Sequence, residues 1–272
     1  LKDAEAALAS TSSVPYSSAA VSKPTFIDIE DASWMWGILI TDKDRVSTTG
    51  ICNFPSHMGS LNYGYASVGG WRRISPKLYN QIPESDVRKG WFLDDTGVSV
   101  NLPAAAQAYI TKKGAPVYTQ VKYGPMNDEW GSNNNATDVI LMRVEEMYLI
   151  KAEAQAMNND VSGGVNTLNS FVNTYRDPSY KCTATTGEAV QEAVWHQRRI
   201  EFWGEGLAYF DIMRLNKGVN RLGCGFPKTA VFNIAAGDPV QIYSIPNKEV
   251  QYNPLLENNP LVSAPTPIPD EE

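Results

Sequence analysis

The fold of this protein is decided by residues 198–214, which read RRIEFWGEGLAYFDIMR. Gly204 and Gly206 separate a charged segment with two large aromatic residues from a second, more apolar segment. Glycine commonly ends helices because it adopts left-handed backbone conformations without a steric penalty. The stretch therefore predicts a joint between two helices, and we expect Gly218 to end the second one. The aromatic residues expected to pack this joint are Phe202, Trp203, Tyr209 and Phe210.

The charges of this stretch have the spacing of ion pairs on one helix. Arg198 lies three residues before Glu201, and Glu205 lies four residues after it. Residues three and four apart are neighbours on a helix surface, so we expect ion pairing along the helix. The candidates for a charge network around the glycine joint are Arg198, Glu201, Glu205, Asp211 and Arg214. A glycoside hydrolase would instead need two carboxylates that face each other across a cleft, and it stays the less favoured alternative.

Residues 138–157, DVILMRVEEMYLIKAEAQAM, predict a strong helix. Thr137 or Asp138 can cap its first turn, since both side chains accept hydrogen bonds from free backbone amides. The small side chains of Ala152, Ala154 and Ala156 leave room for another helix to approach closely. We therefore expect this helix to pack tightly against a neighbour.

A second helix is expected over residues 165–177, after Gly163 and Gly164 break the chain. With the helices on either side of the glycine joint, this gives two helix pairs in tandem. A small-residue helix, a glycine turn and an aromatic helix are the general pattern of a tetratricopeptide-type (TPR) unit, although the strict consensus is not met. The predicted fold class is therefore mainly α, with a TPR-like core over about residues 138–218.

The apolar run WMWGILIT, residues 34–41, is bounded by polar residues. Its length and composition predict a buried strand or helix fragment. We expect Trp34 and Trp36 to belong to the core.

Residues 42–137 lose the helical periodicity and are dense in Gly, Ser, Asn and Pro, which favour turns. Long irregular regions of compact domains are usually functional or disordered, and the interspersed Trp and Tyr argue against disorder. Tyr and Trp rings can stack on the apolar face of a sugar while Asn and Arg side chains hydrogen-bond its hydroxyls; alternatively, these aromatics only staple the loops together. The candidate ligand-binding residues are Asn62, Tyr63, Tyr65, Trp71, Arg72 and Trp130.

Composition excludes some classes of function. The chain has 272 residues, a net charge of −7 and an isoelectric point near 5.0, with no basic run. Binding of nucleic acid through phosphate contacts needs a basic face, so no nucleic-acid partner is expected. No apolar run approaches the roughly 20 residues that span a bilayer.

Metal and disulfide chemistry have weak signals. Three cysteines and two histidines without a CxxC pair make a zinc site improbable, and no cofactor or catalytic residue is expected. Cys182 and Cys224 could form a disulfide in an exported protein, or they could be free thiols. Asp- and Asn-rich loops can hold Ca²⁺, but no EF-hand spacing is present, and no metal site is assigned.

Four segments resemble motifs of the SusD/RagB family, and they occur in the family's order. The first, SPKLYNQIPESDVRKGWF, is similar to the family's loop leading to an Asp-x-Arg motif. LMRVEEMYLIKAEAQAM resembles a family helix, and RRIEFWGEGLAYFDIMRL resembles its charged segment around a Glu-Gly pair. YSIPNKEVQYNPLLENNP is similar to the closing motif.

The resemblance covers the C-terminal half of the family, so residues 1–272 are expected to form a single SusD/RagB-like domain from a longer parent. It implies a surface-exposed, lipid-anchored protein of the outer membrane of a Bacteroidetes-type bacterium, with the lipidated N-terminus absent from this chain. Such proteins are not enzymes. They bind oligosaccharides, or peptides in some branches, for a SusC-like TonB-dependent transporter. A further alternative is an interaction protein whose helix pairs dock a partner.

Overall fold

The computed structural model describes residues 1–48, 53–260, 262–263 and 265–266, and the chain divides into two compact units. The large unit comprises Leu1–Ile74 and Leu78–Glu205, and the small unit comprises Ser75–Lys77 and Gly206–Glu272. The description of residues 1–272 as one domain stays a prediction, because two compact units of a chain can still fold together as one domain.

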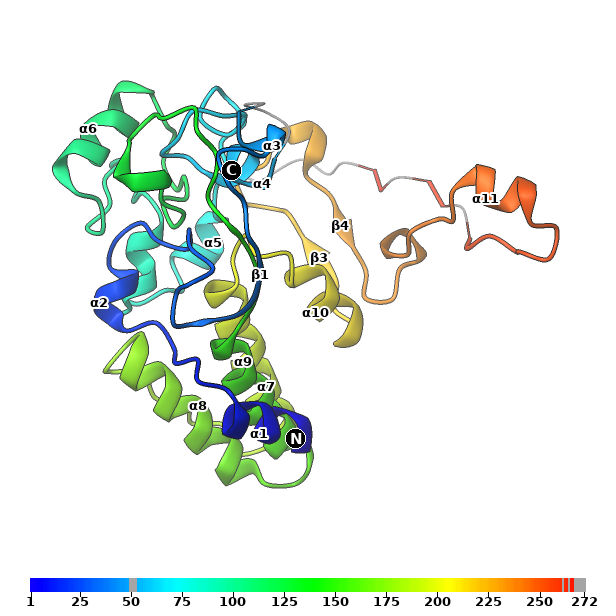
Figure 1. The fold of residues 1–272 in the computed structure, drawn as a ribbon. Helices are drawn as coiled ribbons and strands as arrows, with labels where there is room; N and C mark the ends of the chain where they lie inside the picture. The colour runs from blue at the N-terminus through cyan, green and yellow to red at the C-terminus, as the bar shows by residue number, and fades with distance from the viewer. Residues whose placement is uncertain (49–52, 261, 264, 267–272) are drawn as a thin grey trace. The chain divides into compact units, whose positions relative to one another are not determined.

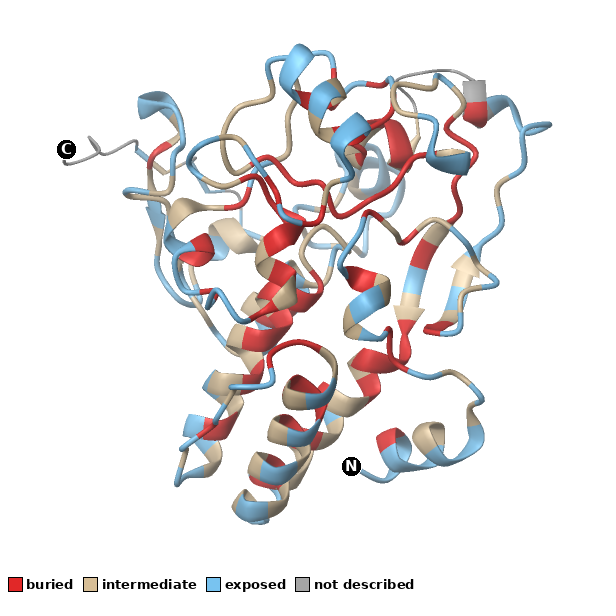
Figure 2. Cartoon of the chain, turned by 90° about the vertical axis from the view of Figure 1, so that its left-hand side faces the viewer, coloured by how far each residue is buried: buried red, intermediate tan, exposed pale blue. Residues whose placement is uncertain are grey.

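Long helices dominate one part of the large unit. Helices α7 (Val144–Met157), α8 (Val161–Tyr175) and α9 (Gly187–Glu201) pack against one another, and the N-terminal helix α1 (Lys2–Ser10) lies against α7 (Figure 1). Figure 2 shows buried and exposed patches alternating along these helices, as expected for amphipathic helices with one face in a core. The mainly α-helical fold class is confirmed.

The closest approach of α7 and α8 depends on small residues. A Cβ atom on Gly164 would lie 2.7 Å from the carbonyl oxygen of Ala152 and 2.9 Å from Cβ of Ala156. The expected close packing at the two alanines is therefore confirmed. The expectation that Gly163 and Gly164 break the chain is wrong, because the carboxylate of Asp160 caps the amide of Gly163 and α8 begins earlier, at Val161.

The helix expected from residue 138 begins later than predicted. Residues Val139–Arg143 form strand β2, which pairs antiparallel with β1 (Trp34–Ile38), and α7 follows directly. Asp138 does not cap a helix, since its carboxylate accepts the backbone amides of Ile29 at 2.8 Å and Ile40 at 2.7 Å. A short apolar run is compatible with a strand and with a helix. Here the hydrogen bonds to β1 favour the strand.

Trp34 and Trp36 are two residues apart in β1, a spacing that places both side chains on one face of a regular strand. The pairing of β1 with β2 is irregular between them, and the two side chains lie in different surroundings. Trp34 is buried and donates an indole hydrogen bond to the hydroxyl of Tyr16 at 2.7 Å, which confirms its predicted place in the core. Trp36 is 65% exposed, so its predicted burial is wrong.

The remainder of the large unit is loop-rich and has only short elements. Two buried apolar clusters organise it, one around Trp91 and the other around Ile110. The short elements are α2 (Ser18–Val21), α3 (Arg45–Thr48), α4 (Phe54–Met58), η1 (Val87–Trp91), α6 (Ala104–Lys112) and η2 (Met126–Asp128); α5 (Pro76–Tyr79) spans the boundary between the units.

The small unit begins just after the glycine joint. Gly204 and Gly206 have φ values of 81° and 85° between the end of α9 and the start of α10 (Ala208–Arg214), so the predicted turn is confirmed. Gly218 does not end α10, because Asn216 adopts the left-handed φ of 48° first. The other elements of the small unit are β3 (Val219–Asn220), η3 (Lys228–Ala230), β4 (Asn233–Ile234), η4 (Pro239–Gln241) and α11 (Asn247–Tyr252), with β3 antiparallel to β4.

The aromatic residues expected to pack the joint lie in different surroundings. Trp203 packs edge-on against Phe92 in the large unit, with 5.2 Å between ring centroids. Tyr209 contacts Tyr243 in the small unit at 5.3 Å, and Phe210 is exposed. Each of these rings therefore contributes to the packing or the surface of its own unit.

Glu201 is the hub of a buried ionic network. Arg88, Arg143 and Arg176 donate to its carboxylate at 3.2, 2.9 and 2.8 Å, and all four side chains are fully buried. The predicted pairing of Glu201 with Arg198 along the helix is wrong, because Glu201 points into the core. Burial alone would raise the pKa of Glu201, but the surrounding guanidinium groups outweigh it and hold that pKa well below its usual range.

Glu205 extends the network. Its carboxylate pairs with Lys122 and with Arg143, the latter at 2.8 Å, and these two cations lower its pKa against the opposing effect of burial. Arg198 pairs with Glu146 on α7 at 3.0 Å. The network balances four cations with four anions: Arg88, Lys122, Arg143 and Arg176 with Asp86, Glu145, Glu201 and Glu205.

Acid should destabilise the protein through Glu201 and Glu205. Their pKa is lower in the folded protein than the ordinary value of 4.5, so the stability that they contribute is present above pH 4.5 and is lost as the pH falls through the folded values. We expect the urea midpoint to fall as the pH drops from about 5 to about 3. The variant Glu205→Gln should lose less stability over that range, because its side chain no longer titrates; equal acid sensitivity of variant and wild type would contradict the assignment.

Candidate functional site

Tyr63 and Tyr65 lie on a loop of the large unit whose backbone is fixed. The amide of Tyr63 donates to the carbonyl of Ser132 at 2.8 Å, and the amide of Ala66 donates to the carbonyl of Ser56 at 2.9 Å. The tyrosines themselves are 46% and 45% exposed. The loop therefore presents two aromatic side chains to solvent from an anchored backbone.

Basic and aromatic groups surround these two rings. His57 stacks on Tyr65 with 5.0 Å between ring centroids, and the guanidinium carbon of Arg72 lies 5.5 Å from the Tyr65 centroid. The Lys113 ammonium lies 6.0 Å from the centroid of Tyr63. Stacked rings with adjacent hydrogen-bond donors form an amphipathic surface suited to a ligand with an apolar face and a hydroxyl rim.

Glycine at position 70 makes the arrangement around Tyr65 possible. A Cβ atom at Gly70 would lie 2.6 Å from the Tyr65 ring, which is closer than real Cβ contacts. The carbonyl of Gly70 also accepts a hydrogen bond from the Arg72 guanidinium at 2.8 Å. Gly70 thus lets the ring lie against the backbone and helps to orient Arg72.

The other candidates from the sequence lie deeper in the loop region. Trp71 and Trp130 are partly buried and pack against the apolar cluster around Ile110. Asn62 is 4% exposed and donates its side-chain amide to Asn135. The structure thus brings Tyr65 and Arg72 together near the surface, with Tyr63 exposed on the same loop, and places Asn62 inside.

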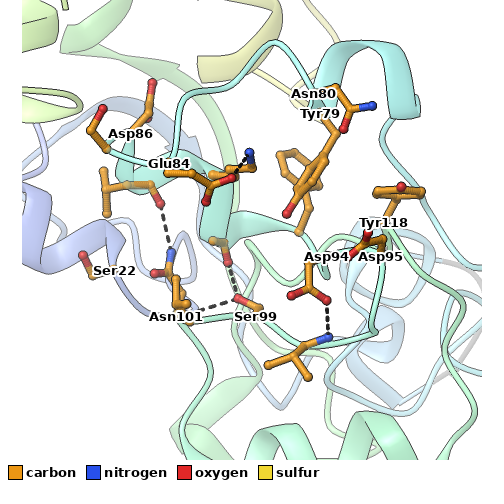
Figure 3. Close-up of a pocket in the computed structure, with 17 residues that line it drawn as sticks. Ser22, Tyr79, Asn80, Glu84, Asp86, Asp94, Asp95, Ser99, Asn101 and Tyr118 are labelled. Carbon is orange, nitrogen blue, oxygen red and sulfur yellow. Dashed lines mark hydrogen bonds and ion pairs between the residues drawn. The ribbon is translucent and has the colours of Figure 1, made fainter. Parts of the chain in front are cut away.

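A pocket of about 520 Å³ lies elsewhere in the loop region of the large unit, with Tyr79 and Tyr118 in its wall (Figure 3). Their ring centroids are 5.1 Å apart. Figure 3 shows Glu84 and Asp94 beside the Tyr79 ring, and Asp95 also lines the pocket. The sequence indicated none of these as site residues, since Tyr79 and Tyr118 are far apart in the chain and Asp94 and Asp95 resemble an ordinary turn.

The backbone of Tyr118 is strained. Its φ of 64° lies in the left-handed region, which bulky residues rarely adopt. Two hydrogen bonds of 3.0 Å hold it there, from the Tyr118 amide to the carbonyl of Leu93 and from the amide of Ile74 to the carbonyl of Tyr118. Such strain persists only where the surrounding structure enforces it, so the Tyr118 ring has a defined position in the pocket wall.

The pocket carries a negative electrostatic potential. Burial is the largest cause of a rise in the pKa of Tyr79 to about 12, and the carboxylates of Asp94, Glu84 and Asp95 add to it. The Lys89 ammonium lies 5.0 Å from the centroid of the Tyr79 ring and pairs with Glu84. A cation is therefore already accommodated between an aromatic face and a carboxylate.

The two carboxylates considered for a glycoside hydrolase, Glu201 and Glu205, belong to the buried ionic network. Glu201 and Glu205 are ion-paired in the core, and their lowered pKa keeps them ionised. A glycosidase acid needs a raised pKa and access to the glycosidic oxygen. These two residues therefore do not form a glycosidase pair.

The possible metal ligands and the thiols of the described residues form neither a metal site nor a disulfide. Within those ranges, no cluster of three or more His, Cys, Asp or Glu side chains is placed to hold a metal ion. Cys182 and Cys224 are free thiols, so the disulfide left open by the sequence is not formed. Cys52 lies outside the described residues. Among the helices that the structure describes, none has both the length and the apolar character to cross a bilayer.

Solved structures with the same fold are found in SusD-like proteins. A SusD superfamily protein from Bacteroides thetaiotaomicron gives a TM-score of 0.72 at 21% identity, over 95% of this chain and 56% of that one. A SusD-like carbohydrate binding protein from Bacteroides vulgatus gives 0.61 at 23% identity, over 91% and 45%. Surface glycan-binding protein A from Bacteroides thetaiotaomicron gives 0.59 at 16% identity, over 95% and 57%. The chain thus spans about half the length of these proteins.

The sequence comparisons point to the same family. A search of the curated proteins gave no significant match. The model of the SusD family matches residues 88–261, which include the Arg88, Arg143 and Glu201 side chains of the buried network. Because this match covers more than half of the sequence and the fold agrees with it, the chain belongs to the SusD (SusD/RagB) family.

Proposed function

We propose that this chain binds oligosaccharide nutrients at the bacterial cell surface and does no chemistry on them. The observation that carries the proposal is the pair of exposed rings, Tyr63 and Tyr65, on a backbone-anchored loop beside Arg72. Support comes from two proteins of the same fold, whose names describe carbohydrate binding and surface glycan binding.

Binding would use stacking and hydrogen bonds. The apolar C–H face of a sugar ring lies on a tyrosine, and the Arg72 guanidinium donates to sugar hydroxyls at the edge of the stack. The anchored loop limits the ordering cost of binding, because the backbone that carries the rings is already fixed. Asn62, Trp71 and Trp130, proposed as further contacts, would act from the deeper layer of the same loops.

Membership of the SusD family extends the proposal to location and partner. The protein would lie at the outer membrane, surface-exposed and held by a lipid anchor. It would deliver its oligosaccharide to a SusC-like TonB-dependent transporter. The alternative within the SusD/RagB family is that the same surface binds peptides. A panel of glycans and peptides distinguishes the two.

A ligand panel tests the proposal. We expect affinity electrophoresis to show retardation by at least one neutral polysaccharide, and calorimetry to show binding of its oligosaccharides with no release of reducing sugar. Peptide mixtures of similar size serve as the comparison. Binding of peptides with no response to any glycan would replace the carbohydrate assignment, and release of reducing sugar by the purified protein would overturn the non-enzymatic one.

A further inference from the structure

The pocket walled by Tyr79 and Tyr118 has the properties of a small-molecule site that is separate from the exposed-tyrosine loop. Its volume of about 520 Å³ lies within the usual range for ligand pockets, roughly 300–1,000 Å³. Neither Tyr63, Tyr65 nor Arg72 lines it. An inference about this pocket therefore does not depend on glycan binding at the exposed tyrosines.

The pocket's own contacts indicate which ligand chemistry it accepts. Lys89 places its ammonium near the face of Tyr79 and against the carboxylate of Glu84, a combination that stabilises cations. This internal pair places a primary ammonium between the face of Tyr79 and the exposed carboxylate of Glu84. The protonated amine of a ligand would lie in similar surroundings beside those pocket carboxylates that do not pair with Lys89.

Two such carboxylates are available. One oxygen of Asp94 accepts the amide of Thr96 at 2.8 Å, its hydroxyl at 2.7 Å and the amide of Val98 at 2.9 Å, and no cation pairs with this carboxylate among the described residues. Those hydrogen bonds outweigh burial and lower the pKa of Asp94, so it stays ionised. Asp95 is exposed and makes no ion pair or hydrogen bond with the described residues.

We propose that this pocket binds an amino sugar, with the protonated amine at Asp94 and Asp95 and the sugar ring against Tyr118 and Tyr79. The combination of aromatic rings with several polar acceptors suits a sugar better than the long apolar stem of a lysine side chain. Selectivity arises from charge, because the lining has acidic groups at Glu84, Asp86, Asp94 and Asp95 and a single basic group at Lys89.

Calorimetry with a matched pair of probes tests the site: a β-linked glucosamine trisaccharide, at a pH where its amines are protonated, and its N-acetylated counterpart, which has no charge. We expect the amine form to bind at least about tenfold more tightly, and its affinity to fall with added salt. Equal affinities for the two probes, or no binding of the amine form, would overturn the proposal.

Variants locate the binding. The double variant Glu84→Gln/Asp95→Asn should weaken binding of the amine probe about tenfold. It removes Asp95, one of the two proposed partners of the amine, and leaves the Lys89 ammonium without its carboxylate partner beside the pocket. Asp42→Asn removes an exposed carboxylate outside the pocket and should have no effect. Lys89→Met should instead strengthen binding, since it removes the competing internal cation. Equal effects of the double variant and of Asp42→Asn would place the amine elsewhere and overturn the site.

Failure here and failure of the proposed function are distinguishable. Neutral oligosaccharides bound at Tyr63 and Tyr65 should not respond to Glu84→Gln/Asp95→Asn. The amine probe should not respond to replacement of Tyr63 and Tyr65. If the amine probe binds wild type and Glu84→Gln/Asp95→Asn equally well, the second site is ruled out. The proposal of glycan binding at Tyr63 and Tyr65 is then unaffected.

Discussion

Replacement of Glu201 by alanine is expected to lower the free energy of unfolding by about 3–5 kcal/mol, the range for removing one partner of a buried ion pair. The change leaves Arg88, Arg143 and Arg176 without their shared carboxylate in a fully buried position. Three like charges then face one another in a medium that screens them poorly. Urea denaturation at neutral pH, followed by circular dichroism, measures the loss.

An exposed ion pair provides the matched control. Glu5 and Lys151 are 3.6 Å apart, and both side chains contact solvent. Glu5→Ala should change the free energy of unfolding by less than about 1 kcal/mol. A similar small change for Glu201→Ala would show that the buried network does not hold the large unit together. If Glu201→Ala fails to fold, Glu201→Gln keeps the shape and some hydrogen bonds and should lie between wild type and alanine.

Residues of three family motifs meet in the buried ionic network of the scaffold. Asp86 and Arg88 come from the first motif, Arg143 and Glu145 from the second, and Glu201 from the charged stretch. All five meet in the buried network. The sequence could therefore predict the family and the helices, but not these pairings, because partners such as Arg88 and Glu201 are 113 residues apart.

Local patterns misled where tertiary contacts decide. Residues 139–143 have a helix-compatible composition but form a strand, because β1 supplies hydrogen bonds. Gly164 resembles a helix breaker, yet it lies within α8 where the backbone of Ala152 leaves no room for a side chain. Trp36 belongs to an apolar run, yet it is exposed at an irregularity in the pairing of β1 with β2, which the sequence does not reveal.

The candidate ligand surface was predictable only in part. The density of Tyr, Trp and Asn near residues 62–72 marked the loop, and its rings Tyr63 and Tyr65 are exposed. Burial of Asn62 depends on its contact with Asn135, which the sequence does not reveal. The pocket had no linear signal, because Tyr79 and Tyr118 are brought together only by the folded chain.

Replacement of both exposed tyrosines should abolish most glycan binding. We expect Tyr63→Ala/Tyr65→Ala to weaken affinity for a glycan identified in the panel by at least about 30-fold, or about 2 kcal/mol, because aromatic anchors dominate binding energy. Its free energy of unfolding should change little, since both side chains are partly exposed and the loop is anchored through its backbone. Tyr252→Ala removes a ring that is 85% exposed in the small unit and serves as the control.

The most direct measurement is calorimetric titration of one bound oligosaccharide into the wild type, Tyr63→Ala/Tyr65→Ala and Tyr252→Ala, with the urea midpoint of each protein recorded alongside. Glycan binding at the exposed loop predicts a loss of at least about 30-fold for the double variant, unchanged affinity for Tyr252→Ala and matching urea midpoints. Wild-type affinity in a folded Tyr63→Ala/Tyr65→Ala protein would contradict it.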